Sequence, residues 1–248
     1  MMWRVVGLEA RDAFFNMAID QIVMEGIRNG TSEPTVRFYT WAPGAVSIGR
    51  FQSLLEEVNI DNCKSLGIDF VRRITGGGAV YHDSMGEITY SVIARENDLS
   101  TGVTETYKLI SQWIIAGLGN LGIKAEFAPI NDITVCGKKV SGNAQTRKSG
   151  VVLQHGTVLY DLNIQKMFSL LNISKEKVSD KMIKSAEERV TCIKNSSSAT
   201  IGQLYSALLD SFTQGKDFYM GRWTRQELDG AKELSSNVYS SDAWNFSR

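Results

Sequence analysis

Residues 72–83 read Arg-Arg-Ile-Thr-Gly-Gly-Gly-Ala-Val-Tyr-His-Asp, and this stretch decides how the rest of the chain is interpreted. Three consecutive glycines, Gly76–Gly78, separate two runs rich in β-branched and aromatic residues. A backbone without Cβ atoms can approach a ligand closely and turn several N–H groups toward an anion. Arg72 and Arg73 add planar guanidinium donors that suit a carboxylate or a phosphate. We interpret the stretch as a ligand-binding loop between strands, in preference to a glycine-rich hairpin with solvated arginines.

This glycine loop differs from the two common nucleotide-binding motifs. It contains neither a GxxxxGK(S/T) segment nor a GxGxxG that opens a helix. A nucleotide bound here would therefore lie on a different scaffold.

A second informative segment covers residues 131–145, NDITVCGKKVSGNAQ. Lys139, on a predicted strand among small residues, can act as a point charge that polarises an acyl carboxylate and neutralises a phosphate. Asn131 and Asp132, at a predicted turn, offer the oxygen ligands that Mg²⁺ prefers. We assign these three residues to the site and interpret Lys138 as solvated.

A third segment, QHGTVL, covers residues 154–159. Thr157 can donate a hydrogen bond to a ligand oxygen from a neighbouring strand. A lone histidine such as His155 is more often a satisfied core or surface residue than a catalyst. Only Thr157 is therefore counted in the site.

The composition indicates a globular enzyme. The 248 residues are 43% hydrophobic and 22% charged, and 27 basic side chains balance 27 acidic ones. This balance argues against general binding to nucleic acid, which needs excess positive charge. Three widely spaced cysteines and two histidines argue against a disulfide framework or a multi-histidine metal site. We find no signal peptide and no run of about 20 apolar residues, so we predict a cytoplasmic protein without a membrane span.

Apolar periodicity predicts strands and helices intermixed along the chain, with adjacent strands often linked by hairpins. The predicted strands are 3–8, 35–41, 45–48, 68–72, 87–94, 138–145 and 151–159, and the predicted helices are 12–28, 54–66 and 104–121. Strands 35–41 and 45–48 are predicted to form a hairpin around Pro43-Gly44. Polar helices are expected after Asp161. This order predicts an α/β (α+β) fold with a mixed, largely antiparallel β-sheet flanked by helices.

Together, RRITGGGAVYHD, ND-x6-KVSGNAQ and QHGTVL resemble the lipoate–protein ligase family, within the biotin/lipoate ligase superfamily. Further similar segments are Asn16–Asp20, Arg37–Tyr39, Ser47–Gln52 and Ser240–Asn245. The resemblance spans nearly the whole chain and implies that residues 1–248 form a single catalytic domain with the ligand in a tunnel over the sheet. It resembles the short form that lacks the C-terminal accessory domain.

The resemblance also implies a site. Lys139 would contact the acyl carbonyl and the phosphate, and Asp132 would lie near Mg²⁺. The residues implied to line the lipoyl-adenylate are Arg73, Thr75, Gly76, Gly77, Gly78, Val80, His82, Asn131, Ala144 and Thr157.

The activity that the resemblance implies has two steps. ATP, with Mg²⁺, activates lipoate to lipoyl-AMP, and the lipoyl group then passes to a lysine of a lipoyl-domain acceptor protein, such as an E2 subunit or the glycine cleavage H protein. Because the accessory domain is absent from the short form, a separate small protein carrying it is expected to be needed for full adenylation.

The alternative is an ATP-independent octanoyl or lipoyl transferase with Cys136 as nucleophile and an acyl-carrier or lipoyl-protein donor. Nearby positive charge lowers the pKa of a thiol, and Cys136 is close to Lys139 in sequence. The cysteine transferases typically read Gly-Gly-Arg where this chain has Gly76–Gly78, and their nucleophile lies further upstream of the lysine. Cys136 is therefore interpreted as a small apolar strand residue. Residues 145–156 resemble the transferases as well, so both activities stay open.

Overall fold

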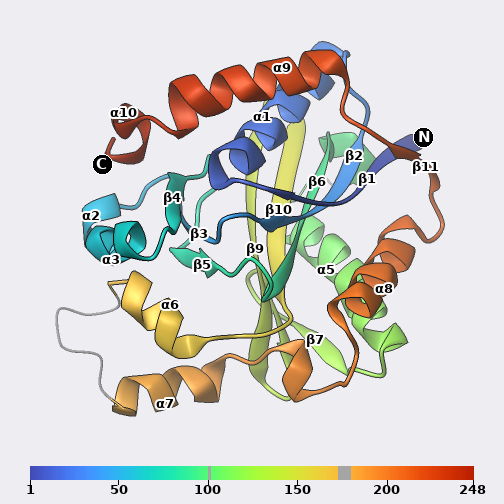
Figure 1. Ribbon diagram of the computed structural model, residues 1–248. Coiled ribbons are helices and arrows are strands. Elements are labelled where there is room, and N and C mark those ends of the chain that lie inside the picture. Colours follow the sequence, from blue (N-terminus) through green and yellow to red (C-terminus); the bar gives the residue numbers. More distant parts are fainter. Residues whose placement is uncertain (100–101, 173–179) are drawn as a thin grey trace.

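The strands of the computed structural model form two separate sheets (Figure 1). The structure describes residues 1–99, 102–172 and 180–248. The large sheet has the order β11-β1-β2-β6-β10-β9-β8-β7, and the small sheet has the order β4-β3-β5. Among neighbours in the large sheet, β1 is parallel to β2 and to β11, and every other pair is antiparallel. The predicted mixed, largely antiparallel sheet flanked by helices is confirmed.

The strands of the large sheet are β1 (Met2–Arg11), β2 (Thr35–Trp41), β6 (Glu87–Arg95), β7 (Ala125–Ala128), β8 (Asp132–Val135), β9 (Lys138–Lys148), β10 (Val151–Leu159) and β11 (Asp217–Gly221). The strands of the small sheet are β3 (Ala45–Ile48), β4 (Asp69–Arg72) and β5 (Val80–His82). The larger helices are α1 (Ala13–Asn29), α5 (Val103–Asn120), α7 (Asp180–Arg189), α8 (Ile201–Thr213) and α9 (Arg225–Leu234). The short helical segments are α2 (Leu54–Glu57), α3 (Ile60–Ser65), α4 (Glu96–Leu99), α6 (Ile164–Leu170), η1 (Ile193–Asn195), η2 (Ser235–Tyr239) and α10 (Asp242–Asn245).

Strand alternation gives the large sheet two buried faces, because successive side chains of a strand point in opposite directions. On β2, Phe38 packs with α5 and α8, whereas Tyr39 and Trp41 pack with α1. Figure 1 shows the same division, with α1 and α9 over one face and α5 and α8 over the other. The small sheet packs with α2, α3 and α6 in a third apolar cluster.

Helix α1 begins and ends where the sequence predicts. The Asp12 side chain accepts a hydrogen bond from the Phe15 N–H, which satisfies a free donor of the first turn. Gly30 ends the helix in the left-handed region at φ 77°, where a residue without a Cβ is favoured. Among the described helices, none is long and apolar enough to cross a bilayer.

The predicted hairpin of strands 35–41 and 45–48 is wrong. At Ala42–Gly44 the chain leaves the large sheet, and β3 then pairs with β4 and β5. A Pro-Gly turn fixes a change of direction, but it does not fix which strand becomes the partner. The predicted helix 54–66 is two short helices, α2 and α3, and the strands β5, β7, β8 and β11 were not predicted.

A buried carboxylate ties α1 to the large sheet. Asp20 is 1% exposed and accepts hydrogen bonds from Arg37 of β2 at 3.0 Å and from Ser91 of β6 at 2.7 Å. The oxygen that accepts from Ser91 also lies 3.4 Å from Nδ1 of His155 on β10. One side chain of α1 therefore holds three strands of the sheet.

Asp20→Asn is expected to lower the free energy of unfolding by about 3–5 kcal/mol, because it leaves the buried Arg37 guanidinium without its counter-charge. Urea unfolding followed by circular dichroism measures the change. Asp229→Asn is the matched control, since Asp229 is exposed in its pair with Arg225, and we expect a change below about 0.5 kcal/mol. Equal losses in the two variants would contradict the assigned role of Asp20.

Candidate active site

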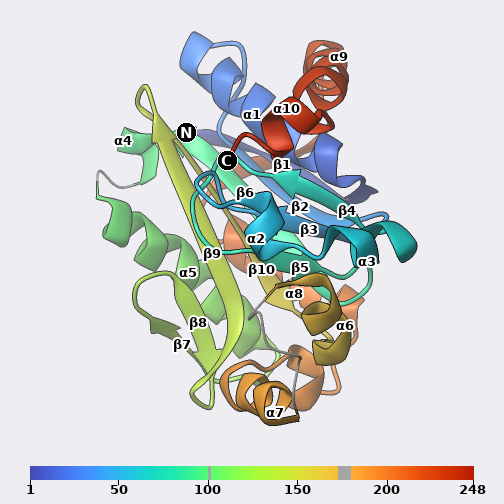
Figure 2. The same ribbon diagram turned by 90° about the vertical axis from the view of Figure 1, so that its left-hand side faces the viewer.

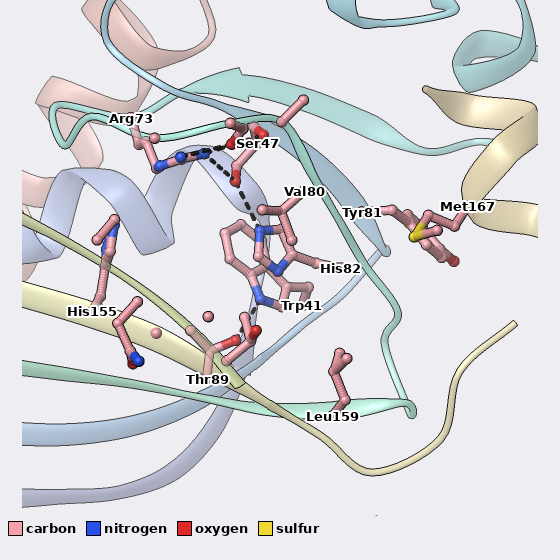
Figure 3. Close-up of a pocket in the computed structure, with 18 of the residues that line it drawn as sticks. Trp41, Ser47, Arg73, Val80, Tyr81, His82, Thr89, His155, Leu159 and Met167 are labelled. Atoms are coloured by element: carbon pink, nitrogen blue, oxygen red, sulfur yellow. Dashed lines mark hydrogen bonds between the residues drawn. The ribbon is translucent and has the colours of Figure 1, made fainter. Parts of the chain in front are cut away.

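A cavity of about 350 Å³ lies between the two sheets, on the α1 side of the large one (Figure 3). Strands β2, β6, β9 and β10 contribute one wall, and β3 and β5 contribute the opposite wall. Most of its lining side chains are apolar or aromatic: Met17, Tyr39, Trp41, Ala79, Val80, Tyr81, Ala144, Leu159, Leu162, Met167, Leu171 and Val190. A cavity of this kind suits an aliphatic chain, since each buried methylene contributes about 0.8 kcal/mol.

The glycine loop closes one side of this cavity, and Arg73 sets its shape. The Arg73 guanidinium donates to the carbonyl oxygens of Gly76 and Gly78 at 2.9 and 2.8 Å, and its other N–H groups bond Ser47 and Thr75. All five of its N–H groups are thus engaged by protein oxygens. Burial lowers the Arg73 pKa to about 10. Arg73 lines the cavity and at the same time fixes the loop.

Arg72 points away from the cavity, so its interpretation as a ligand donor is wrong. It is fully buried and donates to the carbonyl oxygens of Gln52 at 2.6 Å and Asn245 at 2.7 Å. The Asn245 side chain in turn accepts from the Arg72 N–H. Arg72 therefore anchors the segment around α10 against β4. Two adjacent arginines look alike in sequence, and strand alternation sends their side chains in opposite directions.

A polar cluster forms one wall of the cavity. The imidazole of His82 stacks on Trp41, with ring centroids 4.0 Å apart. Its Nδ1 lies 2.6 Å from the Glu87 carboxylate, and its Nε2 lies 2.8 Å from the Ser47 hydroxyl. These contacts fix the ring orientation, as Figure 3 shows for Trp41, Ser47 and His82.

His155 connects the buried carboxylate of α1 to the glycine loop. Its Nε2 lies 2.7 Å from the Thr75 hydroxyl, and its Nδ1 faces Asp20. Burial lowers the pKa of His155, although Asp20 opposes the shift. His155 is thus a buried, hydrogen-bonded histidine, as predicted, and it also lines the cavity.

Lys139 stands on β9, and its Nζ lies 2.7 Å from the Asp132 carboxylate. Its side chain is 42% exposed, so the ammonium lies where the cavity meets solvent. Gly142 leaves room for it, because a Cβ there would lie 2.9 Å from Nζ. The neighbouring Lys138 instead donates to the Glu187 carbonyl oxygen, so it is the second lysine that reaches the cavity.

The sequence suggested that Asp132 lies at a turn, but Asp132 is the first residue of β8. Its carboxylate is engaged by Lys139, and the described part of the chain holds no group of three or more carboxylate, histidine or cysteine side chains that could bind a metal. Protein side chains here do not form a Mg²⁺ site by themselves. Asn131 and Asn143 bond each other through side-chain amides and backbone carbonyls, which joins β9 to the turn before β8.

Most residues predicted for the site line this cavity. These are Arg73, Gly77, Gly78, Val80, His82, Asn131, Lys139, Ala144 and Thr157. Thr75 is fully buried and does not line the cavity. The Gly76 carbonyl oxygen accepts from Arg73, and the Asp132 carboxylate pairs with Lys139, so both contact residues of the lining. The residues that sequence reasoning left without a role include Trp41, Ser47, Glu87 and Thr89. Ser47 belongs to a segment that resembles the lipoate–protein ligase family, whereas no motif in the sequence indicated Trp41, Glu87 or Thr89.

The structure does not bring Cys136 to the cavity. It lies at the β8–β9 turn with φ 50°, followed by Gly137 with φ 74°, and it is exposed. The interpretation of Cys136 as an apolar strand residue is therefore wrong, because a two-residue turn with two positive φ angles occupies this position. Cys63 and Cys192 are buried, and neither lines the cavity.

Comparison with known families agrees with this geometry. Residues 12–213 match the profile of the family described as the lipoyl protein ligase A/B catalytic domain. The chain belongs to this family. It is therefore an enzyme of the lipoate ligase and transferase group, and the resemblance noted in its motifs is confirmed.

Relatives that match this chain along nearly their full length include octanoyltransferases. The chain is 37% identical over 275 aligned positions to octanoyltransferase LipM of Brevibacillus brevis, with 99% of each chain covered. It is 34% identical to octanoyltransferase LipM of Staphylococcus aureus, with 98% of each chain covered. These relatives overturn ATP-dependent activation of lipoate as the main activity expected from sequence, because they favour the transferase alternative.

Solved structures of lipoate ligases share the fold. A bipartite lipoate protein ligase from Thermoplasma acidophilum, studied with its E2 lipoyl domain, superposes with a TM-score of 0.90 at 31% identity, covering 99% of this chain and 96% of that one. A lipoate-protein ligase A bound with ATP gives a TM-score of 0.85 at 29% identity, covering 99% of each chain. The catalytic fold is thus common to ligases and transferases, and the fold alone does not select the acyl donor.

The buried imidazole of His155 generates a prediction for stability against pH. An unfolded histidine has a pKa of about 6.5, and the folded pKa of His155 lies below its ordinary value. Protons therefore bind the unfolded chain preferentially as the pH falls below about 6.5, and the free energy of unfolding decreases. We expect this decrease between pH 7 and pH 5 to be smaller in His155→Gln. Urea midpoints measured across this range test it, and equal slopes in both proteins would refute it.

Proposed function

We propose that this protein transfers an octanoyl group from a thioester donor to the ε-amine of a lysine on a lipoyl-domain acceptor. The observation that carries the proposal is the apolar cavity between the sheets, whose lining includes both the glycine loop and Lys139, with its partly exposed ammonium. The acyl chain occupies the cavity, and its carbonyl carbon lies near Lys139. The octanoyltransferase relatives and the lipoyl domain paired with the Thermoplasma acidophilum ligase support this choice of substrates.

The proposed reaction is a direct aminolysis. The acceptor amine attacks the thioester carbonyl, a C–N bond forms, the C–S bond breaks, and the amine proton passes to the leaving thiolate. The Lys139 ammonium stabilises the negative charge that develops on the carbonyl oxygen, which is the step where a preorganised positive charge has the largest effect. Asp132 holds that ammonium in place by an ion pair, and Arg73 fixes the glycine loop through the Gly78 carbonyl oxygen.

Transfer without a covalent enzyme intermediate follows from the positions of the three cysteines. None of them lines the cavity, and Cys136 occupies an exposed turn. The alignment with the Brevibacillus brevis relative is longer than the 248 residues of this chain, so that relative carries residues without a counterpart here. In this proposal the acyl group passes directly from the thioester to the acceptor amine.

The first experiment measures the intact mass of a lipoyl-domain acceptor after incubation with the protein and an octanoyl thioester. We expect a gain of one octanoyl group without ATP. Lys139→Ala should lower the transfer rate at least ~100-fold, as loss of a preorganised oxyanion contact does. Lys138→Ala is the matched control and should keep the wild-type rate, since Lys138 bonds the Glu187 carbonyl outside the cavity.

A parallel reaction supplies lipoate, ATP and Mg²⁺ in place of the thioester. Modification of the acceptor only in that reaction would overturn the proposal. Modification by the thioester that persists in Lys139→Ala would remove the role assigned to this lysine.

Cys136→Ser should leave the rate of octanoyl transfer unchanged, because the turn that carries the thiol lies outside the cavity lining. Intact mass of the enzyme, quenched in acid during turnover, should show no acyl adduct. An octanoyl adduct that disappears in Cys136→Ser, together with loss of transfer, would show a covalent mechanism instead.

A further inference from the structure

A second hollow, of about 380 Å³, is separate from the first cavity, and the two share no lining residue. Its walls come from α1, the far end of β9, the segments that follow β3 and β4, and the chain from the end of α9 to α10. Figure 2 shows α1, α10 and β9 meeting at one end of the molecule. A hollow of this size falls within the range of small-molecule sites.

One part of this lining is apolar. Met24 belongs to the buried cluster under α1, and Ile74, Leu234 and Trp244 pack against that cluster while they remain partly exposed. Val238 completes the apolar lining. The hollow leaves this apolar surface uncovered, so an aliphatic group that covers it gains free energy.

The rest of the lining carries an excess of positive charge. Arg28, Arg50 and Lys148 line the hollow, and within residues 1–99, 102–172 and 180–248 none of the three forms an ion pair with a carboxylate. The acidic side chain of the lining, Glu25, accepts a hydrogen bond from Gln21. Unpaired cations that line a concave surface form a binding site for an anion.

The buried arginine next to this hollow adds to the excess charge. The buried arginines Arg4 and Arg37 pair with carboxylates, whereas in the part of the chain that the structure describes Arg72 bonds only carbonyl and amide oxygens. Burial lowers the pKa of Arg72, and the like charges of Arg50 and Arg248 lower it further. An anion in the hollow would therefore relieve repulsion among these guanidinium groups.

Arg50 is held in place by its neighbours. Its guanidinium lies 4.5 Å from the ring centroid of Trp244, and the Trp244 indole N–H donates to the carbonyl oxygen of Arg72 at 2.8 Å. The Arg72 guanidinium donates to the backbone carbonyl oxygens of both Arg50 and Trp244. Because both partners of the stack are fixed, Arg50 loses little conformational entropy when it binds an anion.

We propose that this second hollow binds an amphiphilic anion, an aliphatic chain that ends in a carboxylate or a phosphate. The chain covers the apolar lining, and the anionic head meets Arg28, Arg50 and Lys148. A free inorganic anion leaves the apolar surface uncovered, and a neutral chain leaves the cations without a partner, so the lining favours a ligand with both parts. The proposal does not depend on octanoyl transfer, because the two cavities have no residue in common.

Fluorine NMR of the protein labelled with 5-fluorotryptophan reports on the two cavities separately. Trp41 lines the first cavity, Trp244 lines the second, and the other three tryptophans line neither. Trp41→Phe and Trp244→Phe assign the two signals. We expect octanoate and octyl phosphate, titrated in separate samples, to shift the Trp244 signal to saturation, and their relative affinities identify the preferred head group. Butanoate should bind at least ~10-fold more weakly than octanoate, because it lacks four methylenes.

Arg28→Gln/Lys148→Gln should weaken the binding that the Trp244 signal reports at least ~10-fold, as loss of charge-assisted hydrogen bonds does. Both side chains are exposed, so the fold is retained. Any response of the Trp41 signal to octanoate should stay unchanged. Lys124→Gln/Lys232→Gln is the matched control, because it removes the same charge from two exposed positions outside the lining, and it should keep the wild-type affinity.

Three results would overturn the proposal. The first is a Trp244 signal that neither octanoate nor octyl phosphate shifts to saturation. The second is equal affinity for butanoate and octanoate, or for inorganic phosphate and octyl phosphate, which would show a site for a free anion only. The third is an equal change of affinity in the two double variants, which would remove the role of Arg28 and Lys148. Failure of octanoyl transfer would leave this test unaffected, because it measures binding without turnover.

Discussion

The carboxylate of Asp20 is the constraint on which the arrangement of this protein depends. It lies on α1, in the interior, and its oxygens face Arg37, Ser91 and His155 on three different strands. Through His155 the same carboxylate reaches Thr75, and through Thr75 it reaches Arg73 and the glycine loop. A buried charge is tolerated only when its partners are correctly placed, so helix, sheet and loop must come together in one register.

Two arginines that are adjacent in the sequence stabilise the backbone on the two sides of this loop. Arg73 bonds the carbonyl oxygens of the loop from the cavity side, and Arg72 bonds the backbone near α10 from the other side. Neither guanidinium is free to bind substrate. The loop is thus held by buried donors, and the partly exposed cation of the cavity comes from a different strand, at Lys139.

Much of this could be predicted from sequence where local signals are strong. The alternation of β6 and β10, the caps of α1 at Asp12 and Gly30, and the position of Lys139 on a strand all follow from short-range patterns. The separation of β3 from β2 could not be predicted, because sheet membership is decided by distant partners. Cys136 carries no turn signal of its own, since a cysteine at positive φ is uncommon, and the following glycine alone did not reveal the turn.

The division of the strands into two sheets has a consequence for how such a cavity evolves. No strand of the three-stranded sheet pairs with a strand of the eight-stranded one in the described ranges, so only side chains span the gap between them. Exchanging a large side chain for a small one on either wall lengthens or widens the cavity without breaking a backbone hydrogen bond between strands. If the proposed octanoyl transfer holds, mutation could tune the length of the acyl group that fits independently of the scaffold.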